Sequence, residues 1–199
     1  HVHTHNLEFK EFERAFKVNN KKTIVDENVD TFFNGILREN GQVATRNYIG
    51  IVSTVNCSAT VTKMIVEKIK YSNILNDYPN IDGIVPITHS TGCGMNTVSE
   101  GMQMFQRTID GFKNHPNFSH VFVIGLGCEC AQVSLFDESV KKHNRIHFLT
   151  IQDEGGTKKI VEKVLSQIKN LLSEANDIKR TPESVSHLTL ALQCGGSDG

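Results

Sequence analysis

Short apolar runs alternate with amphipathic segments from Tyr48 onward. Five runs have the length, the β-branched content and the glycine or polar boundaries of strands: YIGIVSTV (48–55), DGIVPIT (82–88), HVFVIGLG (120–127), IHFLTI (146–151) and HLTLALQ (187–193). Between them, apolar residues recur at helical spacing over 58–71, 97–112, 133–143 and 157–172. This alternation predicts an α/β domain, a Rossmann-like three-layer sandwich with a mostly parallel sheet of about five strands.

Two stretches fit this pattern less well. Pro86 lies inside the second run, and because a central strand tolerates proline poorly, it indicates an edge strand, a bulge or an early strand end. The residues before the first run are polar and charged, with scattered phenylalanines. We interpret residues 8–45 as a linker or arm that docks aromatic side chains on the body, and residues 46–193 as the α/β domain.

Composition narrows the classes of function. The formal net charge of −1 leaves no basic field of the kind that nucleic-acid binding uses, and the apolar runs are too short to cross a bilayer. We therefore expect no nucleic-acid partner and no membrane association. Five cysteines in a chain too large to need disulfide staples favour free thiols in a reducing cytoplasm, where clustered cysteines more often bind metal or do chemistry.

Cysteine follows four of the five predicted strands directly. The strand-end turns carry Cys57, then His89 and Cys93, then Cys128, Glu129 and Cys130, and finally Cys194, while the fourth strand ends in Gln152, Asp153 and Glu154. Ligands of open parallel sheets bind at the carboxyl ends of the strands, so these residues are expected to converge on one edge. Thiolate, imidazole and carboxylate groups together predict a polar site able to hold a transition metal.

The competing interpretation is structural. Any single buried cysteine can serve as a small hydrophobic residue beside a tight turn, although this explains the set of five less well. Cys128 and Cys130 are two residues apart, so an extended backbone points their thiols in opposite directions and at most one faces the site. His89 could equally be a satisfied structural histidine. The glycine-rich turns match the phosphate-binding motifs poorly, because they lack the third glycine or the lysine.

Four ordered motifs carry a family resemblance: GQVATRNYIGIVSTVNCSATV, YPNIDGIVPITHSTGCG, HPNFSHVFVIGLGCE and LQCGGSDG. Together they resemble altronate and galactarate dehydratases over about residues 33–199. The opening HVHTHN is similar to the end of the small N-terminal domain of altronate-type members. The resemblance implies that residues 1–7 end a truncated N-terminal domain, that residues 194–199 begin a missing C-terminal domain, and that the chain is a fragment of a longer enzyme.

The resemblance implies a cytoplasmic hydro-lyase that converts a sugar acid, altronate or galactarate, to a 2-keto-3-deoxy acid. It also implies a divalent metal, usually Fe²⁺, with Mn²⁺ as the alternative. We assign catalytic roles to His89, Cys93 and Glu129, substrate contacts to Arg46, Asn47 and Cys57, and metal contacts to Cys93, Cys128, Cys194, His3 and His5. Arg46 could instead form a surface salt bridge, and His1, His3 and His5 share one face of an extended strand but could be a cloning remnant.

Other functions stay open at this point. A related lyase could expel another group, such as sulfite from sulfolactate. A protein of a different class, a non-catalytic domain binding a small acid or a metal, would use the same fold without turnover. A structural zinc site is weaker, because paired C-x-x-C knuckles are missing. The expected partners are the sugar-acid substrate and the remaining domains of the same enzyme, with a homo-oligomer left open.

Overall fold

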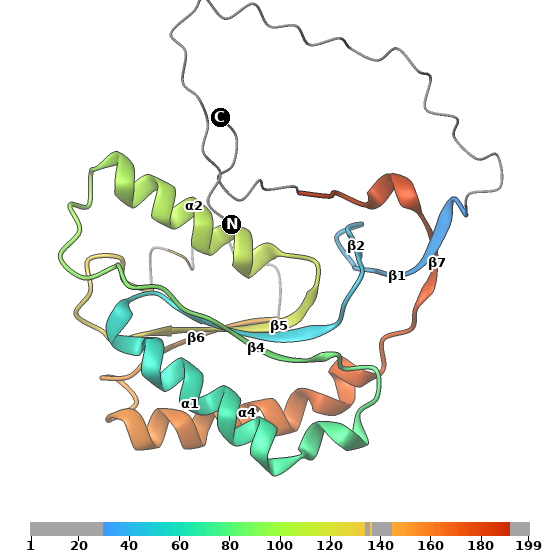
Figure 1. Cartoon of the computed structure of the whole chain (residues 1–199). Coiled ribbons are helices and arrows are strands. Elements are labelled where there is room, and N and C mark those ends of the chain that lie inside the picture. The colour runs from blue at the N-terminus through green and yellow to red at the C-terminus, as the bar shows by residue number, and fades with distance from the viewer. Residues whose placement is uncertain (1–29, 134–135, 137–144, 192–199) are drawn as a thin grey trace, which may run out of the picture.

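The computed structural model describes residues 30–133, 136 and 145–191, and within these it contains two sheets and three long helices (Figure 1). The elements in chain order are β1 (Phe32–Leu37), β2 (Val43–Ala44), β3 (Tyr48–Ser53), α1 (Asn56–Ser72), the 3-10 turn η1 (Ile74–Asp77), β4 (Gly83–Ile87), α2 (Glu100–Asn114), β5 (Phe118–Gly125), β6 (Ile146–Thr150), α4 (Thr157–Asn176), β7 (Thr181–Ser184) and the 3-10 turn η2 (Val185–His187).

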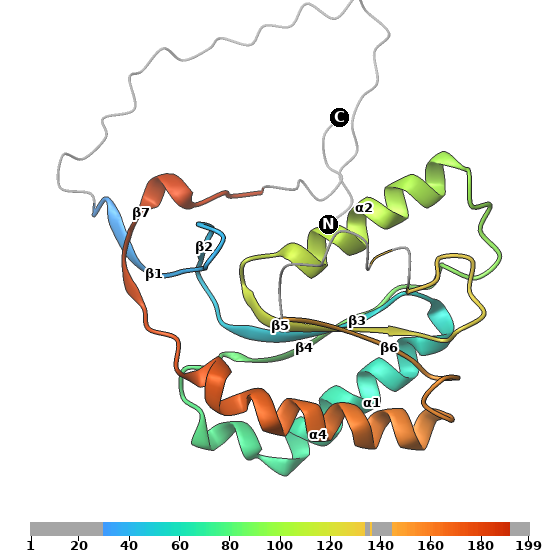
Figure 2. The same cartoon turned by 180° about the vertical axis from the view of Figure 1, so that it is seen from behind.

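The main sheet has the strand order β4-β3-β5-β6, and all its pairings are parallel. Helices α1 and α4 cover one face and α2 covers the other (Figures 1 and 2). A buried apolar cluster lies on each side of the sheet, one against α1 and α4 and the other against α2. The predicted parallel α/β arrangement and four of its strands are therefore confirmed.

The fifth predicted strand is wrong over its described part. Residues 188–191 carry no regular structure, and Leu190 is 82% exposed. After α4 the chain returns to the amino ends of the parallel strands, where β7 pairs with β1 instead of joining the main sheet. The alternating apolar pattern had no sheet face to pack against, so it does not form a strand there; residues 192–193 lie outside the described part.

Local signals account for the element boundaries. α2 begins after Ser99, whose Oγ accepts a hydrogen bond from the Met102 N–H, and α1 ends where Asn73 adopts a left-handed conformation. Pro86 lies in β4, at the edge of the sheet, where no strand on the open side needs its missing N–H. Of the three explanations for this proline, the edge strand is the correct one.

A small antiparallel sheet, in the order β2-β1-β7, was not predicted from the sequence. Its strands β1 and β2 lie inside the range assigned to an arm, and β7 follows α4. The strands are short, and Phe32 on β1 is exposed, so the hydrophobic pattern carried little signal. Among the described helices, none combines the length and the apolar character needed to cross a bilayer.

Candidate functional site

The carboxyl ends of β3 and β5 form the centre of the candidate site. Helix α1 leaves β3 toward β4, whereas β5 lies on the other side of β3 and is reached through α2 on the opposite face of the sheet (Figures 1 and 2). The strand order therefore reverses between β3 and β5. Open α/β sheets bind ligands in the crevice at such a reversal, so the turns after these strands are the first place to look for chemistry.

The turn after β4 is held against the end of β3 by backbone contacts. The Asn56 N–H donates to the Thr91 carbonyl at 2.8 Å, and Gly92 sits directly on the backbone of Thr54. Gly92 and Gly94 both have positive φ, and Cys93 between them is exposed. The glycines thus present the Cys93 thiol at the edge of the sheet, as the sequence predicted from its position.

His89 has both ring nitrogens occupied by the backbone. The Thr91 N–H donates to Nδ1 at 3.2 Å, so the ring carries its proton on Nε2, which donates to the Ser53 carbonyl at 2.9 Å. The ring also packs edge-on against Phe105, with centroids 4.9 Å apart. These contacts fit the alternative role of His89 as a structural histidine with both nitrogens hydrogen-bonded. Proton transfer by the ring would require one of the two hydrogen bonds to break.

Glu129 folds back into the turn after β5 and is buried. Its Oε1 accepts hydrogen bonds from the Thr54 hydroxyl at 2.8 Å and the Leu126 N–H at 3.0 Å, and its Oε2 accepts from the Gly127 N–H at 2.6 Å. This carboxylate ties the end of β5 to the end of β3. Its geometry is that of a positioning residue, and no oxygen is directed toward open solvent.

The described cysteines differ in exposure. Cys57 in the first turn of α1, Cys93 and Cys128 are exposed free thiols at this edge, whereas Cys130 is half-buried against the cluster under α2. The outward Cys128 and inward Cys130 fit the expectation that at most one of the pair faces the site. Cys194, His3 and His5 lie outside the described residues, so their metal-binding roles stay predictions.

A metal site is not complete within residues 30–133, 136 and 145–191. No group of three or more His, Cys, Asp or Glu side chains in this part of the chain lies close enough to hold a metal ion. His89 and Glu129, two harder donors in the strand-end turns of this edge, already use their polar atoms in internal hydrogen bonds. The described residues therefore do not by themselves fit an iron or manganese centre.

A cavity of about 360 Å³ opens beside the same edge, between the ends of β5 and β6. Its polar wall includes Gln132, Thr150, Asp153 and Glu154, and the Thr150 hydroxyl donates to the Asp153 carboxylate. Hydroxyl and carboxylate groups can hydrogen-bond a polyol. The sequence marked Asp153 and Glu154 as strand-end residues but supplied no reason to prefer them over the cysteines.

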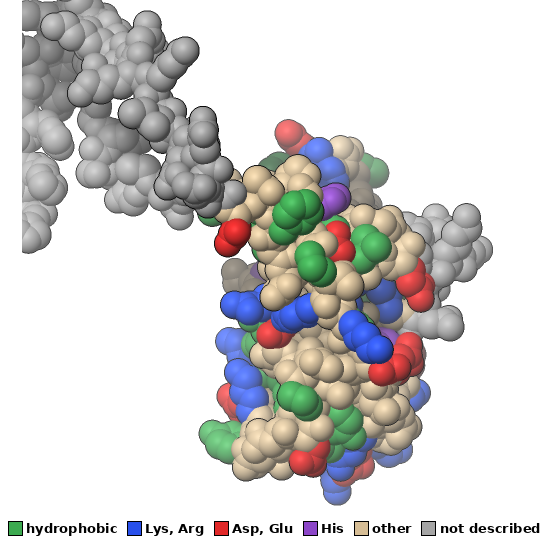
Figure 3. Space-filling model, turned by 90° about the vertical axis from the view of Figure 1, so that its right-hand side faces the viewer, with side chains coloured by type: hydrophobic (Ala, Val, Ile, Leu, Met, Phe, Trp, Pro, Cys, Tyr) green, Lys and Arg blue, Asp and Glu red, His purple; other side chains and the backbone are tan. Residues whose placement is uncertain are grey.

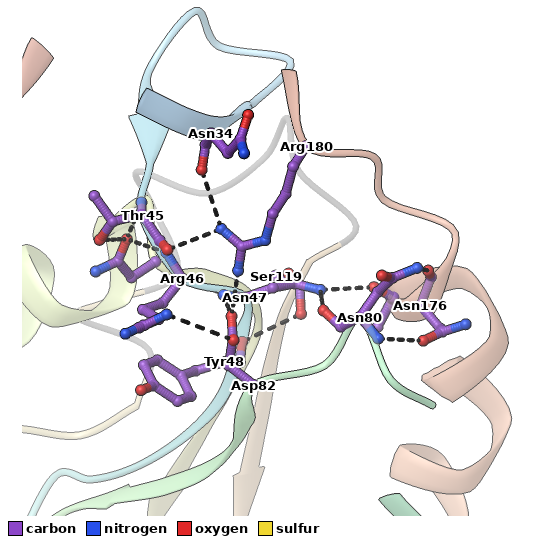
Figure 4. Close-up of polar contacts among 12 residues, drawn as sticks. Asn34, Thr45, Arg46, Asn47, Tyr48, Asn80, Asp82, Ser119, Asn176 and Arg180 are labelled. Carbon is purple, nitrogen blue, oxygen red and sulfur yellow. Dashed lines mark hydrogen bonds and ion pairs between the residues drawn. The ribbon is translucent and has the colours of Figure 1, made fainter. Parts of the chain in front are cut away.

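Arg46 and Asn47 lie at the opposite edge of the sheet from the cysteines. Both precede β3, whose six residues separate the two edges by roughly 20 Å. Arg46 is 57% exposed and faces Asp82 at 4.0 Å, which is the surface salt bridge weighed as its alternative role. Figure 4 shows both residues in a polar network with Asp82 and Arg180. The structure therefore does not bring Arg46 and Asn47 together with Cys57, the third predicted substrate contact, or with the other thiols.

The amino edge also carries a histidine pair that sequence reasoning missed. His120 on β5 and His147 on β6 stack with ring centroids 5.8 Å apart, and His147 also stacks on Phe122. Burial lowers the pKa of His120 to about 4, assisted by the charges of His147, Arg145 and Arg38. Only the register of β5 against β6 makes the two rings neighbours, and no spacing along the chain reveals it.

This shift predicts a stability loss on mild acidification. The unfolded His120 has an ordinary pKa of 6.5 and the folded one about 4, so below about pH 7 the unfolded chain binds more protons. We expect the free energy of unfolding to be about 1–2 kcal/mol lower at pH 5 than at pH 7.5 from this group. Urea unfolding at both values should show a smaller difference in His120→Gln, while the exposed-site control His187→Gln should keep it; an unchanged difference in His120→Gln would contradict the assignment.

The fold and its edge define an open parallel α/β domain with a polar, thiol-bearing carboxyl edge. A family model described as D-galactarate dehydratase/Altronate hydrolase, second domain, matches residues 35–176. The chain therefore belongs to the D-galactarate dehydratase/altronate hydrolase family, and the resemblance inferred from the motifs is confirmed.

Three curated relatives agree with this assignment. The chain is 30% identical to the altronate dehydratase of Escherichia coli (strain K12) over 81% of its own length and 32% of the relative's. It is 34% identical to the galactarate dehydratase (L-threo-forming) of the same organism, over 83% and 33%. The altronate dehydratase of Bacillus subtilis (strain 168) is 28% identical over 86% and 34%. The chain spans about a third of the length of these relatives.

Proposed function

We propose that this chain is part of a hydro-lyase that dehydrates a sugar acid, altronate or galactarate, to a 2-keto-3-deoxy acid. The observation that carries the proposal is the family match over residues 35–176, together with three relatives named as altronate or galactarate dehydratases. Because those relatives are about three times as long, further domains are proposed to complete the active site. The thiol-rich edge fits a cytoplasmic enzyme.

Dehydration of a sugar acid requires two proton transfers, and the carboxyl edge of the sheet offers groups for part of this chemistry. A proton must leave the carbon next to the carboxylate, and the neighbouring hydroxyl must leave with a proton supplied by a general acid. The exposed thiols of Cys57, Cys93 and Cys128 are the groups that this chain offers there. His89 and Glu129 are proposed to hold the turns in place, since their polar atoms bond within the protein. The general base is proposed to come from another domain.

We also propose a requirement for a divalent metal, Fe²⁺ or Mn²⁺. The described residues do not assemble its ligands, so Cys93 and Cys128 would need partners from residues outside them, such as Cys194, His3 or His5. We assign no step of the reaction to the metal. Metal content measured on oxygen-free protein, with and without Cys93→Ser, tests this part separately from turnover.

The decisive experiment measures turnover by the full-length enzyme that we propose contains this chain, prepared without oxygen and supplied with ferrous iron. A panel of hexonates and hexarates is offered, and the 2-keto-3-deoxy product is detected directly. We expect turnover of altronate or galactarate, and near-inactivity of the 199-residue chain alone. Cys93→Ser should lower kcat/KM on the order of 100-fold with the fold intact. The reason is that the exposed Cys93 thiol lies at the carboxyl edge, where we propose that the substrate reacts.

The matched control is Cys130→Ala, since this thiol packs inward and should leave turnover within a few-fold. If a folded, metal-loaded enzyme forms no 2-keto-3-deoxy product from any compound of the panel, the dehydratase proposal is rejected. Sulfite release from sulfolactate would then assign the related lyase, and tight binding of a sugar acid without turnover would assign a non-catalytic domain. Loss of folding in Cys93→Ser would identify a structural thiol instead.

A further inference from the structure

A second cavity, of about 430 Å³, lies at the amino edge of the main sheet, away from the candidate active site. It is enclosed by the end of β1 and the turn after it, the start of β5, the residue before β6 and the end of α4. Its lining residues are Ile36, Leu37, Arg38, Glu39, Asn40, Ser119, His120, Arg145, Glu174, Ala175 and Ile178. Figure 3 views this side of the molecule, where Lys and Arg side chains gather in a band with acidic side chains beside them.

Two of the lining side chains are arginines without an acidic partner among the described residues. Arg38 donates to the Pro116 carbonyl at 2.8 Å and to the Asn47 Oδ1 at 3.2 Å, and Arg145 donates to the Phe118 carbonyl at 3.0 Å. Burial lowers the pKa of both, and for Arg38, whose pKa falls to about 10, the charges of Arg145 and Arg180 lower it further. Both stay charged at neutral pH, so the cavity wall holds two positive charges that repel each other.

His120 supplies a third polar group to the same wall. The residue is 7% exposed, and its Nδ1 is buried without a hydrogen-bond partner among the described residues. A buried polar atom left unpaired is unfavourable by about 1–3 kcal/mol, and a bound ion or water is one way to supply the missing partner. The two carboxylates of the lining, Glu39 and Glu174, belong to exposed residues and contact neither arginine as an ion pair within the described chain.

We propose that this amino-edge cavity binds a small oxyanion, a carboxylate or inorganic phosphate, with Arg38 and Arg145 as charge partners and His120 Nδ1 as a hydrogen-bond donor. Guanidinium groups suit such anions because their planar donors match pairs of oxygens. An anion here relieves the repulsion between the arginines and pairs the orphaned nitrogen.

The site predicts a proton linkage. The groups facing His120 are His147 from β6, Arg145 before it, Arg38 from the turn after β1 and, through His147, Glu174 from α4. A bound anion adds a negative charge to this set and therefore raises the pKa of His120 above the value of about 4. The contribution of His120 to anion affinity must then increase as the pH falls from 7 toward 5, because binding of the anion and protonation of His120 favour each other.

Calorimetric titration of the 199-residue chain with inorganic phosphate and with succinate, at low ionic strength, tests the proposal. We expect saturable binding of at least one of them and none of neutral mannitol; the anion that binds identifies the ligand class. Arg145→Gln should weaken binding about 10-fold or more, because a charged hydrogen-bonded pair is lost. The matched control Arg107→Gln, which removes an exposed arginine of α2, should change affinity less than 2-fold, roughly the effect expected of a distant screened charge.

A histidine titration by NMR supplies an independent readout. The pKa of His120 should rise in the presence of the bound anion and stay unchanged in Arg145→Gln. If Arg145→Gln does not fold, His120→Gln takes its place; with the same anion, affinity at pH 5 relative to pH 7 should then be lower in the variant than in the parent chain. Absence of saturable binding of either anion, or equal weakening in Arg107→Gln and Arg145→Gln, overturns the proposal. None of these measurements depends on dehydratase activity.

Discussion

Replacing Gly92 by alanine is expected to lower the free energy of unfolding by about 3–5 kcal/mol. Gly92 has φ +96°, where an L side chain is strained. A Cβ at this position would also lie 2.5 Å from the Thr54 carbonyl oxygen and 2.9 Å from the Val55 Cα, and both atoms belong to the backbone at the end of β3. Since neither can rotate away, the turn after β4 must move off the sheet. Urea unfolding followed by circular dichroism measures the loss.

Gly94→Ala is the matched control for that variant. Gly94 also has positive φ, of +67°, and lies two residues away in the same turn, but a Cβ there meets no atom within 4 Å. Its replacement should cost only about 1 kcal/mol, from the backbone conformation alone. The difference in unfolding free energy between the two variants measures the cost of bringing a Cβ at residue 92 against the backbone that follows β3. This close approach is what positions Cys93. Equal losses in both would show that conformation, and not contact with β3, explains these glycines.

Asn47→Ala is expected to produce the second large effect, a loss of about 3–4 kcal/mol. The side chain is fully buried, and its Nδ2 donates to the Asn80 carbonyl at 2.8 Å and the Ala175 carbonyl at 2.9 Å, while its Oδ1 accepts from Arg38. It therefore joins the start of β3 to the turn before β4 and the end of α4 (Figure 4). Alanine leaves all three partners without this hydrogen bond, and the bond to the Ala175 carbonyl is buried, where water cannot easily replace it.

Two further variants sharpen this test. Asn47→Asp replaces the donor with an oxygen that faces two carbonyls, so it should be at least as destabilising as alanine. Asn40→Ala, at an exposed turn where, among the described residues, the side chain bonds only to Gln42, should stay within about 0.5 kcal/mol of the parent chain. The midpoint and slope of urea unfolding measure all three. A loss below about 1 kcal/mol in Asn47→Ala would mean that the network is replaceable by water.

The sequence predicted the residues at the carboxyl edge of the sheet better than those at the amino edge. At the carboxyl edge, strand-end turns are visible in the sequence, and Cys57, Cys93 and Cys128 lie there exposed as expected. The roles of their neighbours were not visible, because His89 bonds to the Ser53 carbonyl of β3 and Glu129 to the Thr54 hydroxyl just after it. At the amino edge the sequence suggested a substrate contact for Asn47 but not its hydrogen bonds to Arg38, Asn80 and Ala175, which come from three other segments.

The sequence by itself determined the parallel α/β class, four of its strands and the family, because apolar periodicity and ordered motifs are local properties of the chain. Only the tertiary structure decided that the chain returns after α4 to pair β7 with β1, and that His120, Arg38 and Arg145 share one cavity. These outcomes depend on strand register and on the path of the chain between elements. Both are set by packing between distant segments, which no local pattern encodes.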